Sequence, residues 1–112
     1  MIEKTVLNYL SEKLVDIPVY MEHQKNDPQT FVILEKTGSS RENYIKRSTF
    51  AIQSYAPSML KAAELNETVK DLMDDIVALD EIVRSEINTD YNYTDTTKKQ
   101  YRYQAVYDIT HY

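Results

Sequence analysis

Apolar residues recur along the chain with two periods, one typical of helices and one typical of strands. Leucines and valines at helical spacing predict an amphipathic helix over residues 2–15, which ends before Pro18 because the residue preceding a proline avoids the helical region. A second apolar stripe predicts a longer helix over residues 57–80. Pro57 suits its first turn, where the missing N–H would have no partner.

Five further segments have the composition or the alternation of β-strands. The predicted strands cover residues 19–22, 30–36, 44–55, 83–93 and 101–110. The second of them is a nearly continuous apolar run, which is typical of a strand covered on both faces. Polar segments separate the strands: a turn at 24–29, a loop at 37–43 that carries the only glycine, and a hairpin tip at 94–100.

Alternation of side chains predicts which residues share a face of each strand. Phe50, Ile52 and Ser54 share one face, and the odd-numbered residues share one face in each of the last two strands. The element order is helix, three strands, long helix, two strands. It predicts an α+β fold, a mostly antiparallel sheet of four to five strands with two helices packed on one face.

Composition narrows the class of protein. With 112 residues, one domain over 1–112 is expected. The net charge of -5 disfavours direct nucleic-acid binding, since such proteins need positive surface against the phosphates. No apolar run approaches the roughly 20 residues that span a bilayer, so no membrane association is expected. The N-terminus lacks the basic and apolar segments of a signal peptide.

No pattern of an enzyme, metal site or cofactor site emerges. The absence of cysteine excludes thiolate chemistry, and a single glycine excludes a glycine-rich phosphate loop. His23 and His111 are far apart in sequence, and we interpret both as surface or rim residues. The adjacent carboxylates Asp74 and Asp75 point about 100° apart on a helix, so they predict a solvated face. We therefore predict a non-enzymatic protein without catalytic residues, metal or cofactor.

Other features favour self-assembly and protein contacts. The last two strands are predicted to be about ten residues long, against a usual five or six, and long strands with an open edge invite pairing with another chain. The chain also has ten tyrosines, which suit interfaces. Two basic clusters are candidate contact points for acidic partner surfaces. The predicted contact residues are Arg41 and Arg47 beside the glycine loop, and Lys98, Lys99 and Arg102 at the hairpin.

Four stretches, taken in order, resemble small tail-completion proteins of phages that infect Gram-positive bacteria. They are FVILEKTG at 31–38, AIQSYA at 51–56, AAELNETV at 62–69, and DYNYTD at 90–95 with YRYQAVYDI at 101–109. That group is similar in fold to the tail terminators of lambdoid phages (the minor tail protein U type) and to the tail-to-head joining protein. The resemblance covers nearly the whole chain and depends on order and spacing.

The resemblance implies a structural virion protein of a long-tailed phage, located at the head–tail junction and assembled in the host cytoplasm. Its partners would be itself, as a hexameric ring, the major tail-tube protein, and the head connector or stopper. The ring would cap the head-proximal end of the tube and stop its growth. The group has no catalytic residues to transfer.

Three alternatives stay open at this level. One is a head-side connector or stopper subunit, which belongs to the same virion but to a different junction. Another is a small host-encoded module that binds a partner protein. A small hydrolase or metal enzyme is the third, and it would require a cleft that gathers His23 with buried carboxylates.

Overall fold

The structure is a computed structural model that describes residues 1–112. Two helices and a five-stranded sheet confirm the predicted α+β fold and its element order. The elements are α1 (Ile2–Lys13), β1 (Val19–Tyr20), β2 (Phe31–Glu42), β3 (Ile45–Tyr55), α2 (Met59–Asp75), the short 3-10 helix η1 (Ile76–Ala78), β4 (Ile82–Asn92) and β5 (Arg102–His111).

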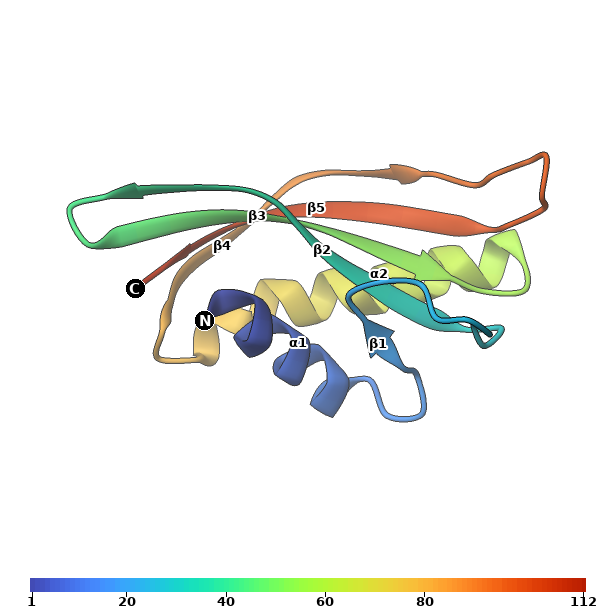
Figure 1. Ribbon diagram of the computed structural model, residues 1–112, viewed down its shortest axis with the longest axis horizontal. Coiled ribbons are helices and arrows are strands. Elements are labelled where there is room, and N and C mark those ends of the chain that lie inside the picture. The colour runs from blue at the N-terminus through green and yellow to red at the C-terminus, as the bar shows by residue number, and fades with distance from the viewer.

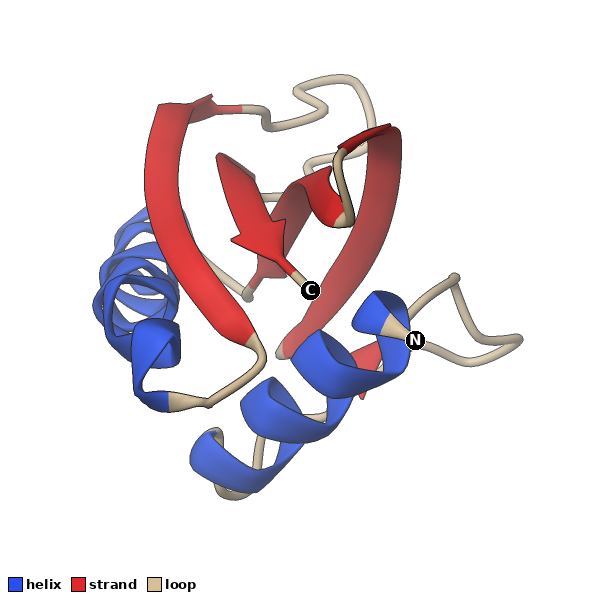
Figure 2. Cartoon of the chain, turned by 90° about the vertical axis from the view of Figure 1, so that its left-hand side faces the viewer, coloured by secondary structure: helices blue, strands red, loops and turns tan.

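The strands lie in the order β1-β2-β3-β5-β4, so β4 and the short β1 form the two edges. Every pairing is antiparallel except that of β1 with β2. The molecule measures 45 × 25 × 24 Å, and its long axis follows two hairpins that leave the centre in opposite directions (Figure 1). The strands twist strongly from one edge of the sheet to the other, as Figure 2 shows from one end of the molecule.

The core lies between the helices and one face of the sheet. Figure 1 shows α1 and α2 on the same side of the long strands. A cluster of 17 buried residues joins the apolar stripes of both helices to alternate residues of β2, β3 and β5. Phe50 and Ile52 of β3 belong to this cluster, as their predicted face requires. The Ser58 side chain accepts a hydrogen bond from the Lys61 amide and so caps α2.

A smaller cluster lies on the opposite face of the sheet. Phe31 and Ile33 of β2 pack there with Tyr55 of β3, and half-buried Tyr20 covers them. All four residues from 31 to 34 are buried, which confirms that this run is covered on both faces. The segment between β1 and β2 packs over this smaller cluster and shields that part of the sheet face from solvent.

The predicted loop at 37–43 is wrong. β2 continues to Glu42 and pairs with β3 up to Ile45, so the turn contains only Asn43 and Tyr44. Gly38 lies inside β2 where the register shifts, and its φ is not positive. Polar residues fill this half of the hairpin because both of its faces meet water. We name residues 37–47 the arm.

The faces predicted for β4 are only partly right. The register of β4 against β5 shifts at Val83 and again at Asn88. Ile87 pairs with Tyr107 on the helix side, whereas Tyr91 pairs with Gln104 on the other side. A bulge adds one residue and so exchanges the faces beyond it, which simple alternation cannot anticipate.

Candidate functional site

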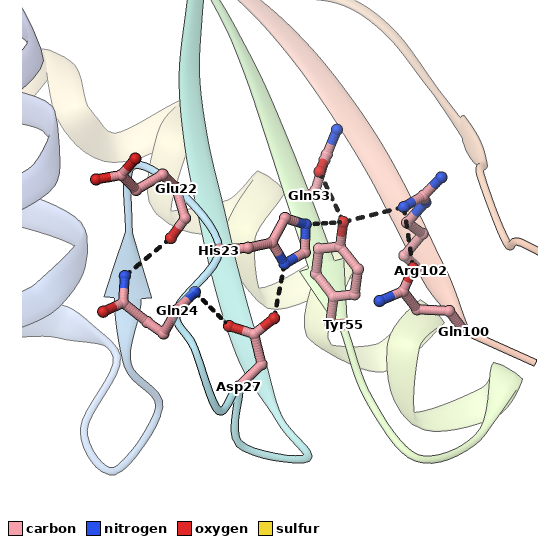
Figure 3. A network of polar contacts seen from close by, with 8 residues as sticks. All are labelled: Glu22, His23, Gln24, Asp27, Gln53, Tyr55, Gln100 and Arg102. Atoms are coloured by element: carbon pink, nitrogen blue, oxygen red, sulfur yellow. Dashed lines mark hydrogen bonds and ion pairs between the residues drawn. The ribbon is translucent and has the colours of Figure 1, made fainter. Parts of the chain in front are cut away.

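The sheet face without helices carries a network of polar side chains centred on Tyr55 (Figure 3). Its hydroxyl donates to Gln53 Oε1 at 2.9 Å, accepts from Arg102 at 3.1 Å and lies 3.2 Å from His23 Nε2. The other ring nitrogen of His23 lies 2.7 Å from an Asp27 oxygen. The network therefore connects the segment between β1 and β2 with β3 and β5.

Aromatic packing holds the same residues. The rings of Phe31 and Tyr55 stack with centroids 4.4 Å apart and planes inclined by 6°. The His23 ring meets both edge-on, at 5.9 and 5.3 Å. Each aromatic pair of this kind contributes about 0.5–1.5 kcal/mol in addition to the free energy gained from burying its apolar area. These contacts fix the loop over the second cluster.

Asp27 contacts His23, and His23 contacts Tyr55, in the same carboxylate–imidazole–hydroxyl order as an acid–base relay. Burial raises the pKa of Tyr55, and the hydrogen bond from Arg102 only partly offsets this rise. The Tyr55 hydroxyl donates to the amide oxygen of Gln53, and the roles in its contact with His23 Nε2 depend on the histidine tautomer. Tyr55 is thus a neutral packing residue. Its contacts with His23, together with the contact between His23 and Asp27, hold the segment between β1 and β2 against the sheet, and we call this arrangement the clamp.

Two further rows of hydrogen-bonded polar side chains run across the same face towards the edge strand β4. Gln53 donates to Gln104 at 2.8 Å, and Gln104 in turn contacts the Tyr91 hydroxyl of β4. In the second row, Thr49 and Asn88 both donate to Asp108, at 2.7 and 3.1 Å. Side-chain pairs of this kind stabilise neighbouring strands and keep the face in one arrangement.

His111 is not the rim residue that the sequence predicts. Its exposed fraction is 5 %, and its ring nitrogens lie 2.9 Å from Ser48 Oγ and 3.1 Å from the Tyr112 carbonyl. It borders a surface depression of about 590 Å³ between α1 and the base of the arm. There Lys36 pairs with Glu3 at 3.1 Å. A backbone hydrogen bond and then Lys36 hold the pKa of Glu3 below its usual range.

The five predicted contact residues occupy opposite ends of the molecule. Arg41 and Arg47 lie on the exposed arm, whereas Lys98 and Lys99 lie at the tip of the β4–β5 hairpin. Figure 1 shows these two hairpins at the left and right ends of the sheet. Arg102 differs from the other four, because its guanidinium lies 4.3 Å from the Tyr93 ring centroid and donates to the Tyr93 carbonyl at 2.6 Å. It therefore packs the hairpin base.

Sequence reasoning missed Tyr44 at the tip of the arm. This side chain is 93 % exposed, and neighbouring Ile45 is 44 % exposed. Asn43 and Tyr44 have φ angles of 49° and 70°, as in two-residue turns that favour glycine at the second position. The signal that could have found this turn is Asn43, because asparagine tolerates positive φ.

The sequence predicts long final strands with an open edge, and the sheet order identifies β4 as the strand that forms this edge. Only its first residue, Ile82, is buried, and its outer backbone has no partner strand. Val83, Ile87 and Tyr91 are each at least 40 % exposed along it. An exposed strand edge with apolar side chains is a template for pairing with another chain.

Comparisons of the chain with family models and with curated proteins give no match. Neither helix is long and apolar enough to cross a membrane. No group of three or more histidine or carboxylate side chains converges on a point where a metal ion could bind.

Proposed function

We propose that this protein is a structural subunit of a long-tailed phage, which assembles into a ring on the head-proximal end of the tail tube. The ring stops tube growth and forms part of the head–tail joint. The proposal rests on the resemblance of the ordered sequence stretches, together with one structural observation, the open edge of β4.

The β4 edge supports the proposal because it is a long binding surface that the chain itself does not use. β4 has eleven residues, and nine of them pair on one side only, with β5. A stable monomer protects such an edge by shortening or covering it. In a ring, the next subunit would satisfy the free edge and cover its apolar side chains.

The two hairpins give the subunit contacts at both ends. The arm and the β4–β5 tip lie at opposite ends of the 45 Å axis. Lys98 and Lys99 at the tip are exposed and have no ion-pair partner. We propose that this tip meets acidic surface on the last ring of the tube. One matched face and one face that refuses further tube subunits are enough to end polymerisation.

Electron microscopy of tube ends tests the proposal. Purified protein mixed with polymerising tail-tube protein is expected to give capped tubes of limited length. The Lys98→Glu, Lys99→Glu variant should leave tubes uncapped, whereas Lys4→Glu, Lys13→Glu, which changes exposed lysines on α1, should cap normally. Uncontrolled tube growth in the presence of the unaltered protein would refute tube capping.

Depletion of the protein during phage growth separates the terminator from the stopper. Loss of a terminator should give overlong tails. Loss of a head-side stopper should give tails of normal length and heads that release DNA. The first outcome supports the proposed function, and the second replaces it with the head-side alternative.

A further inference from the structure

We infer that the arm of one subunit binds a second copy of this chain, on a surface between α2 and β4. We name this surface the acceptor and define it by Asp71, Asp74, Val77 and Ile87. The inference rests on the proposed function only in requiring that the subunits associate with one another.

The tip of the arm carries a side chain that the fold itself does not require. Tyr44 has a φ of 70° in a two-residue turn, a conformation that glycine adopts without strain and tyrosine does not. Its side chain is 93 % exposed, so it does not stabilise its own subunit by burial. A strained, exposed aromatic residue is therefore best explained by a contact outside the subunit.

Positive charge surrounds this tyrosine. Arg41, Lys46 and Arg47 flank the turn and form no ion pair within the chain. Glu42 is the only acidic residue of the arm. The arm thus presents an aromatic tip with a basic surround, although the whole chain has a net charge of -5.

The acceptor has the opposite pattern. Val77 and Ile87 are each 46 % exposed, although both are apolar. Asp74 accepts a hydrogen bond from Tyr107, the cross-strand partner of Ile87, so this carboxylate lies near Ile87. Val77 follows Asp74 by three residues, in the short helix η1 that continues α2. The helix α2 carries five carboxylates against two lysines. An apolar centre with an acidic surround complements the arm in both respects.

The arm cannot serve the acceptor of its own subunit, since Tyr44 is almost fully exposed. The two surfaces are different patches of one chain, so the contact is head-to-tail and each subunit offers both halves. Such contacts close into a ring when the rotation between neighbours divides a full turn. In this arrangement the basic residues of the arm bind the neighbouring copy of the chain. Lys98 and Lys99, at the other end of the subunit, bind the tail tube.

Two variants that each destroy one half of the contact test the inference. The arm variant is Tyr44→Gly with Arg47→Glu, and the acceptor variant is Asp71→Lys with Val77→Lys. Each keeps the other half intact. Sedimentation velocity and light scattering measure association, and the melting temperature confirms that each variant is folded. Lys98→Glu with Lys99→Glu is the control, since it changes charge at the other end of the molecule.

The unaltered protein and the control are expected to form closed oligomers. Each interface variant alone should associate roughly tenfold more weakly or not at all. An equimolar mixture of the two variants should form a dimer of one chain of each kind and nothing larger, because only one intact contact remains.

Three outcomes would overturn the inference: an unaltered protein that stays monomeric, an interface variant that assembles normally, or a mixture that stays monomeric. Normal assembly by the arm variant with loss of tube binding would assign the arm to the tube instead. Closed rings that follow the expected pattern but fail to cap tubes would refute the proposed function and leave the inference standing.

Discussion

The Tyr107 hydroxyl donates a 2.9 Å hydrogen bond to an Asp74 carboxylate oxygen and so joins β5 to α2. The same hydroxyl lies 3.1 Å from the Lys70 carbonyl. The Tyr107 side chain is otherwise fully buried in the main core. Tyr107 thus fills part of the core and also holds α2, the helix that carries the acidic surface, at a fixed position against β5.

Tyr107→Phe keeps the ring and removes the hydroxyl, so it tests this link. We expect the free energy of unfolding to fall by about 1.5–3 kcal/mol, the usual contribution of a hydrogen bond to a charged group. Urea denaturation followed by circular dichroism measures it. Tyr103→Phe is a matched control on the same strand, because the Tyr103 hydroxyl makes no hydrogen bond within the chain, and a change within about 0.5 kcal/mol is expected there.

Alkaline pH should weaken the folded state. Burial, and then the hydrogen bond to Asp74, raise the pKa of Tyr107 far above its ordinary value of 10.0. The unfolded chain therefore loses this proton first, and stability that is complete below pH 10 declines as the pH rises further. Tyr107→Phe should show a shallower decline between pH 10 and 11.5 than the unaltered protein. Equal slopes would contradict the assignment, although Tyr9 and Tyr55, whose pKa values burial also raises, contribute to both curves.

The clamp on the segment between β1 and β2 depends on Asp27. Its carboxylate accepts from the Gln24 amide at 2.7 Å and contacts His23 at 2.7 Å. We expect Asp27→Ala to speed hydrogen exchange of the Gln24 amide and to leave that of Leu10 in α1 unchanged. Nuclear magnetic resonance measures both amides in one sample.

The same carboxylate should respond to acid. The hydrogen bond with His23 holds the pKa of Asp27 below its ordinary value of 3.8. Its contribution to folding is therefore present above pH 3.8 and is lost as the pH falls below that value. Protection of the Gln24 amide should decline in this range in the unaltered protein. Protection that does not change with pH would show that Asp27 does not hold the loop.

Arg102 should behave unlike the other predicted contact residues. It donates to Tyr93 and Tyr55 and stacks on the Tyr93 ring, so Arg102→Glu should lower the free energy of unfolding by about 1–2 kcal/mol. Lys98→Glu at the exposed tip should change it by less than about 0.5 kcal/mol. Thermal or urea unfolding of both variants decides the matter, and an equal small effect would place Arg102 among the free surface residues.

The polar half of β2 shows why the arm could not be predicted from the sequence. Residues 37–42 lack apolar alternation because neither face is covered, and polarity without a period predicts a loop. They are strand because the pairing of β2 with β3, which begins at buried pairs such as Leu34 with Ile52, continues outwards beyond a register shift next to Gly38. His111 is a similar case, since burial of a residue so near the terminus depends on its pairing with Ile82 and Lys46.

The sequence by itself determined the two helices, the five strand segments in their order along the chain, and which residues share a face in β3 and β5. It did so because burial of a helix stripe or strand face requires apolar residues at a fixed local period. Only the tertiary structure decided where the bulges of β4 exchange its faces, that Arg102 packs between tyrosines, and that Tyr44 stands alone at the end of an arm. These features depend on contacts between residues distant in the chain, and such contacts have no local period.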